Sequence, residues 1–334
     1  MSLPFDPADS ADPSDPADPA DRADRADPAG TVGDRSPLGE LRLAAYAKVN
    51  LCLYVGERRE DGRHELVTLF ESIDLADELL ITESATGADE VVCPAVPGPN
   101  LVGSALAGLR ELGWAAPPLR VEIDKRIPIA AGMGGGSADA AALLRHASEL
   151  APVRADAVAA LAAQLGSDVP SQLDPGPAIG TGAGDQVRLL ADAGEHALLV
   201  IPQSFGLSTA DVYRAFDERD RIRSRTDLLA MDVALETTLV GTGWVLPPSL
   251  TVNELQAAAL TLRPEINRAL TAARLVGAER AIVCGSGPTV IGLYWGDEAW
   301  PRAAAAAAEV AEVFPGAVAA RPRHRGVGDR TSNG

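Results

Sequence analysis

Apolar and polar residues alternate along three segments in the first half of the chain, and this alternation predicts β-strands. The segments begin near Leu41, after a turn at Asp61-Gly62, and at Leu119. Other segments carry apolar residues at spacings of three and four, which is typical of amphipathic helices. Helices are therefore expected at 100–114, 137–150 and 154–166.

A second series of strands and helices starts after about Gly194. Strands are expected at 196–203 and on both sides of a glycine turn within 281–296, and helices at 208–218, 264–278 and 298–314. Neither half shows the regular strand–helix alternation of a doubly wound parallel sheet. The pattern predicts an α+β fold in which two domains, 38–190 and 191–325, meet across a cleft.

The first 37 residues differ from the rest of the chain in composition. Pro, Asp and Ala dominate, and nine aspartates stand against three arginines. Because this segment has few apolar side chains to bury, residues 1–37 are predicted to form a disordered tail. A short flexible tail is also expected at 326–334.

Charge and cysteine content narrow the class of protein. The 334 residues include 47 acids and 29 bases, for a net charge of −18. An acidic surface repels nucleic acid and anionic lipid, so neither partner is expected. No apolar run reaches transmembrane length, and no signal-peptide pattern opens the chain. Cys52, Cys93 and Cys284 match no zinc spacing, so a reducing cytoplasm is expected, with the cysteines as small core residues. The chain is expected to be a monomer or homodimer.

Lysine is rare in this chain, since only Lys48 and Lys125 stand among the 29 bases. Lys48 lies in an otherwise apolar predicted strand, so its ammonium group must meet an acceptor or face a cleft. Strand alternation points Lys48 and Asn50 to the same side. The alternative is an edge strand with a solvated lysine.

Four glycines fill five positions, 132–136, between a predicted strand and a predicted helix. Such a bare backbone lets N–H groups surround an anion at a helix N-terminus. The loop is not a P-loop, because no lysine precedes Ser137, and it lacks the third glycine of the dinucleotide motif. Ser137 is a candidate helix cap, phosphate donor or metal ligand. A flexible turn packed on another backbone is the alternative.

Two shorter motifs complete the set of candidates. "GSDVP" at 166–170 places Asp168 in a turn, where an aspartate is either a helix cap or a catalytic base. "GSGPTV" at 285–290 is either a hairpin turn or a second wall of the anion site. His146, His196 and His324 lack partners at metal-ligand spacing.

In this order the motifs resemble the GHMP kinase superfamily over about residues 41–300. "PIAAGMGGGSADAA" is similar to the motif that cradles ATP phosphates, and "GSGPTV" to the family's third motif. The best match within the superfamily is the branch that phosphorylates the 2-hydroxyl of a cytidine-diphosphate-linked polyol in the non-mevalonate isoprenoid pathway. The resemblance therefore implies a small-molecule kinase with ATP and Mg²⁺ as cofactors.

The resemblance also implies roles for individual residues. Asp168 would be the general base, with Lys48 beside it, and Ser137 would be a possible Mg²⁺ ligand. His64 would read the edge of the cytosine base, and Tyr213 would stack on its face. The implied substrate contacts are Asn50, Arg63, His64, Tyr213, Gly285, Ser286 and Gly287. The implied ATP loop comprises Pro128, Ile129, Ala130, Ala131, Gly132, Met133, Gly134, Gly135, Gly136, Ser137 and Ala138.

The chain departs from the family pattern on the acceptor side. Arg63 stands where the family usually has a tyrosine before the histidine, and Ser171-Gln172 replace residues that are usually aromatic. These changes leave two alternatives open: a GHMP kinase acting on another small alcohol, or a non-catalytic nucleotide-binding relative. Arginine also stacks on bases and binds phosphate, so the cytidine-diphosphate acceptor stays consistent with the motif.

Overall fold

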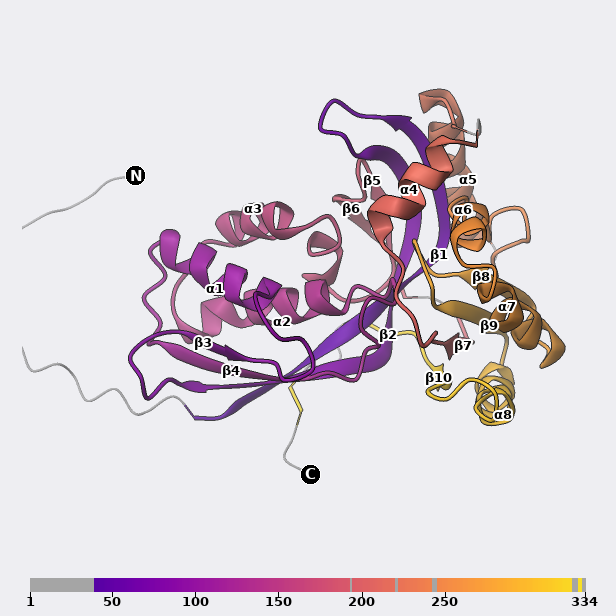
Figure 1. The fold of residues 1–334 in the computed structure, drawn as a ribbon. Helices are drawn as coiled ribbons and strands as arrows, with labels where there is room; N and C mark the ends of the chain where they lie inside the picture. The colour runs from indigo at the N-terminus through magenta and orange to yellow at the C-terminus, as the bar shows by residue number, and fades with distance from the viewer. Residues whose placement is uncertain (1–38, 193, 220–221, 242–244, 326–329, 332–334) are drawn as a thin grey trace, which may run out of the picture. The chain divides into compact units, whose positions relative to one another are not determined.

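The computed structural model describes residues 39–192, 194–219, 222–241, 245–325 and 330–331. The expected tails at 1–37 and, apart from 330–331, at 326–334 lie outside these residues. The described residues belong to one compact unit with an α+β fold (Figure 1). The predicted division into 38–190 and 191–325 places its boundary in the connection between the two sheets described below, and remains a prediction.

The first sheet is built on a long antiparallel pair, β1 and β2, whose strands have 18 and 20 residues. Their length matches the extended apolar alternation of the sequence. The order of strands in this sheet is β3-β4-β2-β5-β6, with β1 paired to β2 outside this path. Strand β3 runs parallel to β4. The strands are β1 (Leu41–Arg58), β2 (His64–Glu83), β3 (Glu90–Val92), β4 (Leu119–Asp124), β5 (Ala178–Thr181) and β6 (Gln186–Leu189).

Three helices belong to the first sheet: α1 (Leu101–Glu111), α2 (Gly135–Leu150) and α3 (Ala155–Leu165). Helix α2 packs on β1 and β2, and α1 contacts both α2 and α3. Helix α2 begins two residues earlier than the predicted Ser137, because Gly134 takes a left-handed conformation and starts the helix at Gly135. The first helical turn therefore consists of the glycine loop itself.

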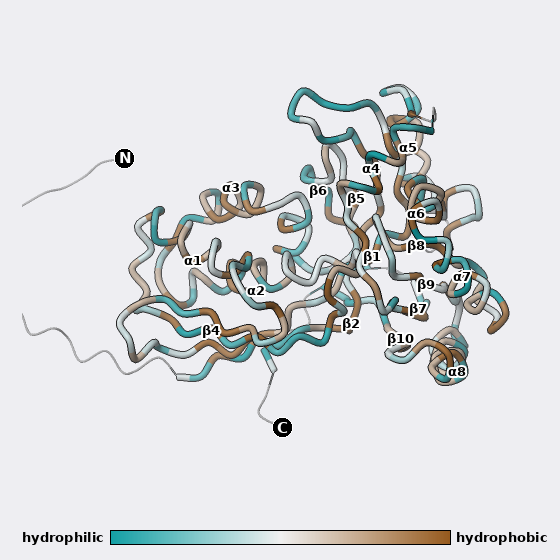
Figure 2. Tube along the Cα trace, viewed as in Figure 1, coloured by the Kyte–Doolittle hydropathy of each residue, from teal (hydrophilic) through white to brown (hydrophobic). Residues whose placement is uncertain are grey.

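The second sheet is antiparallel, with the order β10-β7-β9-β8. Its strands are β7 (His196–Ile201), β8 (Arg280–Val283), β9 (Val290–Trp295) and β10 (Val318–Ala320). Helices α7 (Ile266–Leu275) and α8 (Ala299–Val310) pack on it. Figure 2 shows apolar segments on these strands and a hydrophilic tip on the β1–β2 hairpin.

Three further helices are α4 (Thr209–Asp217), α5 (Arg225–Gly241) and α6 (Gln256–Leu262). The predicted cap of α4 is confirmed, since Ser208 Oγ accepts a hydrogen bond from the N–H of Asp211. Helices α5 and α6 were not predicted. The apolar residues of α5 do not gather on one face, which removes the periodic signal that identifies a helix in a sequence.

Candidate active site

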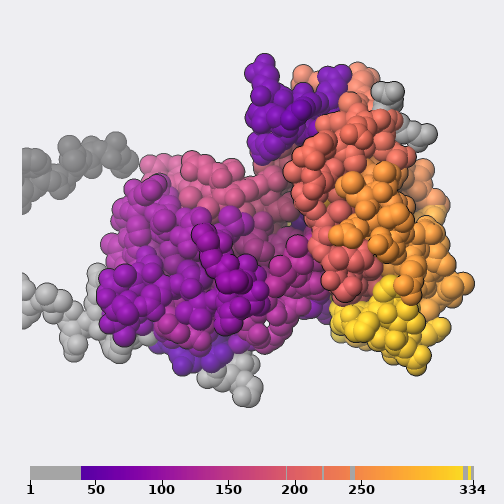
Figure 3. Space-filling view, viewed as in Figure 1, coloured from indigo at the N-terminus to yellow at the C-terminus, as the bar shows by residue number. Residues whose placement is uncertain are grey.

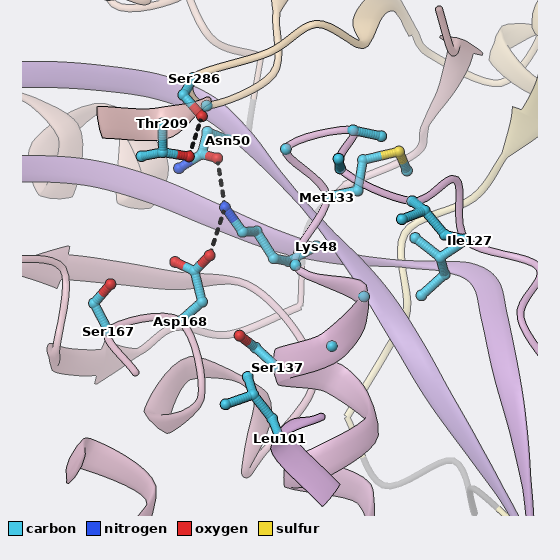
Figure 4. Close-up of a pocket in the computed structure, with 18 of the residues that line it drawn as sticks. Lys48, Asn50, Leu101, Ile127, Met133, Ser137, Ser167, Asp168, Thr209 and Ser286 are labelled. Carbon is cyan, nitrogen blue, oxygen red and sulfur yellow. Dashed lines mark hydrogen bonds and ion pairs between the residues drawn. The ribbon is translucent and has the colours of Figure 1, made fainter. Parts of the chain in front are cut away.

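Strand β1 carries Lys48 into the interior, where its side chain is 6% exposed. The ammonium group donates to Asn50 Oδ1 at 3.0 Å and lies 3.3 Å from Asp168 Oδ2. Figure 4 shows this pair of contacts across the pocket. The ring of Phe70 lies 5.4 Å from the same nitrogen. Lys48 is therefore neither solvated nor on an open edge, and its charge is directed at the predicted base.

Asp168 lies in the turn between α3 and a short 3-10 helix, Pro170–Gln172. Its side chain is 34% exposed, so the carboxylate is open to the cavity as well as to Lys48. Ser171 Oγ donates to the carbonyl oxygen of Asp168 at 2.9 Å. Ser171 and Gln172 are both buried, and the N–H of Gln172 donates to the carbonyl oxygen of Val169, so both residues belong to the packing of this turn.

The glycine loop requires its glycines for two separate reasons. Gly132 and Gly134 have φ values of 79° and 67°, which residues with a side chain rarely adopt. A Cβ on Gly132 would lie 2.7 Å from the carbonyl oxygen of Cys284 and 2.9 Å from that of Gly287. The loop is thus pressed directly against the "GSGPTV" turn. The turn joins β8 to β9, and Gly285 and Ser286 also line the cavity.

Asn253 fixes the "GSGPTV" turn, and no motif in the sequence identified it. Its Nδ2 group donates to the carbonyl oxygens of Val283 and Gly285, each at 2.7 Å. Ser286 Oγ lies 2.9 Å from Thr209 Oγ1, which ties the turn to the start of α4. An isolated buried asparagine in an irregular segment gives no periodic signal, and only its two long-range bonds reveal its role.

These elements enclose a cavity of about 480 Å³. Lys48, Asn50, Asp168, Tyr213, Gly285 and Ser286 line it, together with every residue from Pro128 to Ser137. Ala138 is fully buried in α2 and does not reach the cavity. Gly287, Arg63 and His64 also lie outside the lining. The structure therefore brings the predicted base, lysine and phosphate loop together around one cavity, and these four residues are not among its lining residues.

The second lysine, Lys125, lies beneath the glycine loop. Its ammonium group binds Asp77 of β2 and lies 2.8 Å from Asp139 Oδ2 of α2. Asp77 also accepts the backbone N–H groups of Arg126 and Ile127. Burial and the neighbouring Asp77 raise the pKa of Asp139 to about 7, although Lys125 opposes the shift. The scarcity of lysine in the sequence is the signal that marks this cluster.

Arg63 and His64 both contact other protein groups, and their expected roles toward the substrate remain predictions. The guanidinium of Arg63 pairs with Asp61 Oδ2 at 2.9 Å and with Asp185 Oδ2 at 3.3 Å. The ring of His64 stacks on Tyr213, with centroids 5.1 Å apart. His64 therefore packs behind Tyr213, while Arg63 ties the hairpin tip to the β5–β6 turn.

Metal-ligand candidates are few. In the part of the chain that the structure describes, no group of three or more His, Cys, Asp or Glu side chains is placed to hold a metal ion. The Ser137 hydroxyl and the Asp168 carboxylate do reach the cavity. Among the described helices, none combines the length and apolarity needed to span a bilayer.

Two family models match the chain: the GHMP kinases N terminal domain over residues 100–177 and the GHMP kinases C terminal model over 247–315. A 4-diphosphocytidyl-2-C-methyl-D-erythritol kinase from Nocardioides sp. is 40% identical over 75% of this chain and 86% of its own length. A relative of the same name from Nocardia farcinica is 41% identical over 80% of this chain and 88% of its own.

Solved structures agree with these matches. The crystal structure of 4-(cytidine 5'-diphospho)-2C-methyl-D-erythritol kinase is 30% identical, with a TM-score of 0.65, and the match covers 84% of this chain and 98% of that one. A homoserine kinase from Cytophaga hutchinsonii, at 18% identity and a TM-score of 0.62, shares the fold over 87% of this chain and 96% of its own.

Proposed function

Because the chain belongs to the 4-diphosphocytidyl-2-C-methyl-D-erythritol kinases, a family of small-molecule kinases with the GHMP kinase fold, we propose that ATP is its phosphoryl donor and that Asp168 activates the acceptor. The acceptor group is the 2-hydroxyl of 4-diphosphocytidyl-2-C-methyl-D-erythritol. The observation that carries the proposal is the 3.3 Å pair of Lys48 and Asp168 in the same cavity as the glycine loop.

Asp168 acts as the general base in this proposal. Its carboxylate is partly exposed to the cavity, where it accepts the proton of the acceptor hydroxyl as that oxygen attacks phosphorus. A tertiary alcohol is a poor nucleophile, so a positioned base speeds its attack. The Lys48 ammonium holds the carboxylate in place and offsets negative charge on the transferring phosphoryl group.

The glycine loop holds the phosphates of the donor. Its backbone N–H groups open α2, whose N-terminus carries partial positive charge, and the loop leaves no side chain between this backbone and an anion. A Cβ at Gly134 would lie 3.0 Å from Lys48 Cγ, so the bare backbone also admits the lysine.

The cavity fits Mg²⁺ bound to a nucleotide better than a free metal ion. Mg²⁺ keeps several waters and takes most of its other ligands from phosphate, so one or two protein oxygens suffice. Ser137 is the cavity-lining side chain that would hold it. When bound, Mg²⁺ neutralises charge on the phosphate oxygens.

Purified protein with ATP, Mg²⁺ and the cytidyl acceptor tests the proposal through ADP release. We expect ADP formation that depends on the acceptor, together with a phosphorylated product detected by ³¹P resonance. Turnover with a different small alcohol, and none with the cytidyl acceptor, would contradict the assigned substrate.

A further inference from the structure

Arg145 lies in the second half of α2 and binds two other elements that surround the cavity. Its Nη1 group donates to the carbonyl oxygen of Gln172 at 2.7 Å, and its Nη2 group donates to the carbonyl oxygen of Ala44 at 3.0 Å. Gln172 ends the 3-10 helix that follows Asp168, and Ala44 belongs to β1. One guanidinium therefore joins α2, β1 and the turn that bears Asp168.

Each of these three elements carries one part of the proposed active site. Helix α2 opens with the glycine loop, β1 carries Lys48 four residues after Ala44, and the turn carries Asp168. In Figure 3 the part of the chain that holds these elements, indigo to magenta, forms a continuous surface. Arg145 does not line the cavity, so it acts on the reacting groups only through the backbone that it binds.

The turn that bears Asp168 has a second attachment, through the side chain of Gln172. Its Oε1 atom accepts a hydrogen bond from Ser72 Oγ at 3.3 Å, and Ser72 is the partner of Lys48 in the β1–β2 register. Ser72 Oγ also accepts the N–H of Gly176 at 3.2 Å. Gln172 and Ser72 are both buried. The turn is thus attached to the strand pair at the level of Lys48.

The shape of the guanidinium suits this bridge. It presents several N–H donors in fixed directions in one plane, and it stays charged at every working pH. Hydrogen bonds from a charged donor are stronger than those between neutral groups. Two carbonyl oxygens on different elements are therefore held in a fixed relation, which limits movement of the Asp168 turn relative to the strand that carries Lys48.

We propose that Arg145 is a positioning residue that fixes the Asp168 carboxylate against Lys48. The inference rests on the proposed function, because it assumes that Asp168 is the base. Gln172 departs from the family pattern, and its polar side chain bonds Ser72 where an aromatic residue is usual. A displacement of about 1 Å at a reacting group costs up to roughly 100-fold in rate, so the bridge acts on kcat.

Replacement of Arg145 by Met removes both donors and keeps a long apolar side chain. We expect kcat to fall roughly 10- to 100-fold. The KM for ATP should stay unchanged, because the N–H of Lys48 still bonds Met133 and Gly132 still packs against the 284–287 turn. Arg145→Lys keeps the charge without the planar fork, so kcat should stay low in this variant too.

Arg110→Met is the matched control. Arg110 of α1 also donates to main-chain carbonyl oxygens, and it does not line the cavity. The control should lower the free energy of unfolding at least as much as Arg145→Met and leave kcat unchanged. Urea unfolding and kcat at saturating substrates are the measurements, and Arg145→Lys carries the test if Arg145→Met does not fold. Wild-type kcat in the Arg145 variants, or an equal fall in Arg110→Met, would overturn the inference.

The lysine side chains provide a measurement that needs no turnover, because Lys48 and Lys125 are the only lysines in the sequence. Lysine labelled with ¹³C at Cε gives two side-chain signals, which Lys48→Met assigns. In Arg145→Met the Lys48 signal should move toward its position in Asp168→Asn. The Lys125 signal should stay in place, since its own carboxylate partners are untouched. An unmoved Lys48 signal would contradict the positioning role.

The two measurements separate this inference from the proposed function. A Lys48 signal that moves in Arg145→Met, in a protein whose wild type phosphorylates no cytidyl acceptor, would support the positioning of Asp168 and contradict the kinase assignment. Turnover by the wild type, with an unmoved Lys48 signal and an unchanged kcat in Arg145→Met, would contradict the positioning role alone.

Discussion

The Lys48 ammonium lies 3.3 Å from the Asp168 carboxylate, although one residue comes from the middle of β1 and the other from the turn after α3. The backbone also holds the lysine in place, because the N–H of Lys48 donates to the carbonyl oxygen of Met133 at 3.0 Å. The strand that carries the lysine is thus bonded directly to the glycine loop. The proposed base, cation and phosphate cradle form one connected unit.

Replacement of Asp168 by Asn should abolish most turnover. The amide matches the carboxylate in shape but cannot accept the acceptor's proton, so kcat should fall roughly 10²- to 10⁴-fold. The affinity for ATP should change little, which equilibrium nucleotide binding measures. Asp174→Asn is the control, because the Asp174 side chain is half exposed and its ion pair with Arg325 is long, at 3.6 Å. Undiminished turnover in Asp168→Asn would refute the base assignment.

Replacement of Lys48 by Met should lower kcat roughly 10²- to 10³-fold, the usual effect of removing one preorganised donor. Lys48→Arg should not restore activity. The Lys48 side chain is buried between Asn50 and Asp168, and a larger planar guanidinium does not reproduce the compact ammonium there. The measurement is kcat at saturating ATP and acceptor. Wild-type kcat in the arginine variant would show that charge alone suffices at this position.

Replacement of Gly132 by Ala should destabilise the protein and weaken ATP binding together. The added methyl group meets the carbonyl oxygens of Cys284 and Gly287, and the φ of 79° is strained for alanine. We expect a loss of about 2 kcal/mol or more in the free energy of unfolding. Gly103→Ala in α1, where the nearest atom is 3.8 Å away, should be neutral or slightly stabilising. Urea unfolding compares the two, and equal stabilities would contradict the prediction.

Replacement of Arg63 by Tyr should leave the affinity for the cytidyl acceptor equal or higher. Arg63 is engaged by Asp61 and Asp185, so its removal takes no contact from the cavity, while tyrosine adds a stacking ring at the hairpin tip. The KM for the cytidyl acceptor is the measurement that tests this prediction. A large rise, with an unchanged KM for ATP, would assign Arg63 a direct contact with the substrate.

Stability should decline as pH rises through neutrality because of His196. Its Nδ1 lies 2.8 Å from the carbonyl oxygen of Gly194 and its Nε2 lies 2.8 Å from Glu71 Oε2, so both nitrogens face acceptors. Burial opposes the charged ring, but the Glu71 carboxylate outweighs it and raises the pKa of His196 above 6.5. The folded state then binds this proton more tightly than the unfolded chain. Its stabilising contribution is complete below pH 6.5 and disappears as pH passes the raised pKa.

Urea unfolding at about pH 6 and about pH 9 measures this decline. His196→Gln should reduce the difference between the two free energies of unfolding. His324→Gln is the control, because the His324 side chain is 51% exposed. This variant should keep the wild-type difference between the two free energies of unfolding. An identical pH dependence in wild type and His196→Gln would contradict the prediction.

Local pattern predicted the α+β class and the position of the glycine loop between a strand and a helix. Alternation and helical spacing are patterns of neighbouring residues, so they can be recognised in the sequence alone. Lysine stands out because it is rare in this chain, and the glycine cluster because its backbone is unusually free. The start of α2 at Gly135 was missed by two residues, because glycines rank poorly as helix formers and only the left-handed Gly134 marks the boundary.

Contacts between residues far apart in the chain could not be predicted from local sequence patterns. No local rule places Asn253 under the carbonyls of Val283 and Gly285, or Asp217 on the ring of His64. The ion pairs of Arg63 could not be predicted for the same reason. Arginine suits both stacking and ion pairing, and the choice depended on Asp185, which lies far along the chain and next to it in space.

The sequence by itself therefore determined most types of element and the place of the glycine loop, because residue spacing encodes local backbone geometry. The roles predicted for Asp168 and Lys48 came from the family resemblance. The tertiary structure decided which of these groups meet. It brought Lys48 to Asp168, pressed Gly132 against the 284–287 turn, and stacked the ring of His64 on that of Tyr213. Such contacts arise from the packing of whole strands and helices, so their energies depend on segments that no short stretch of sequence contains.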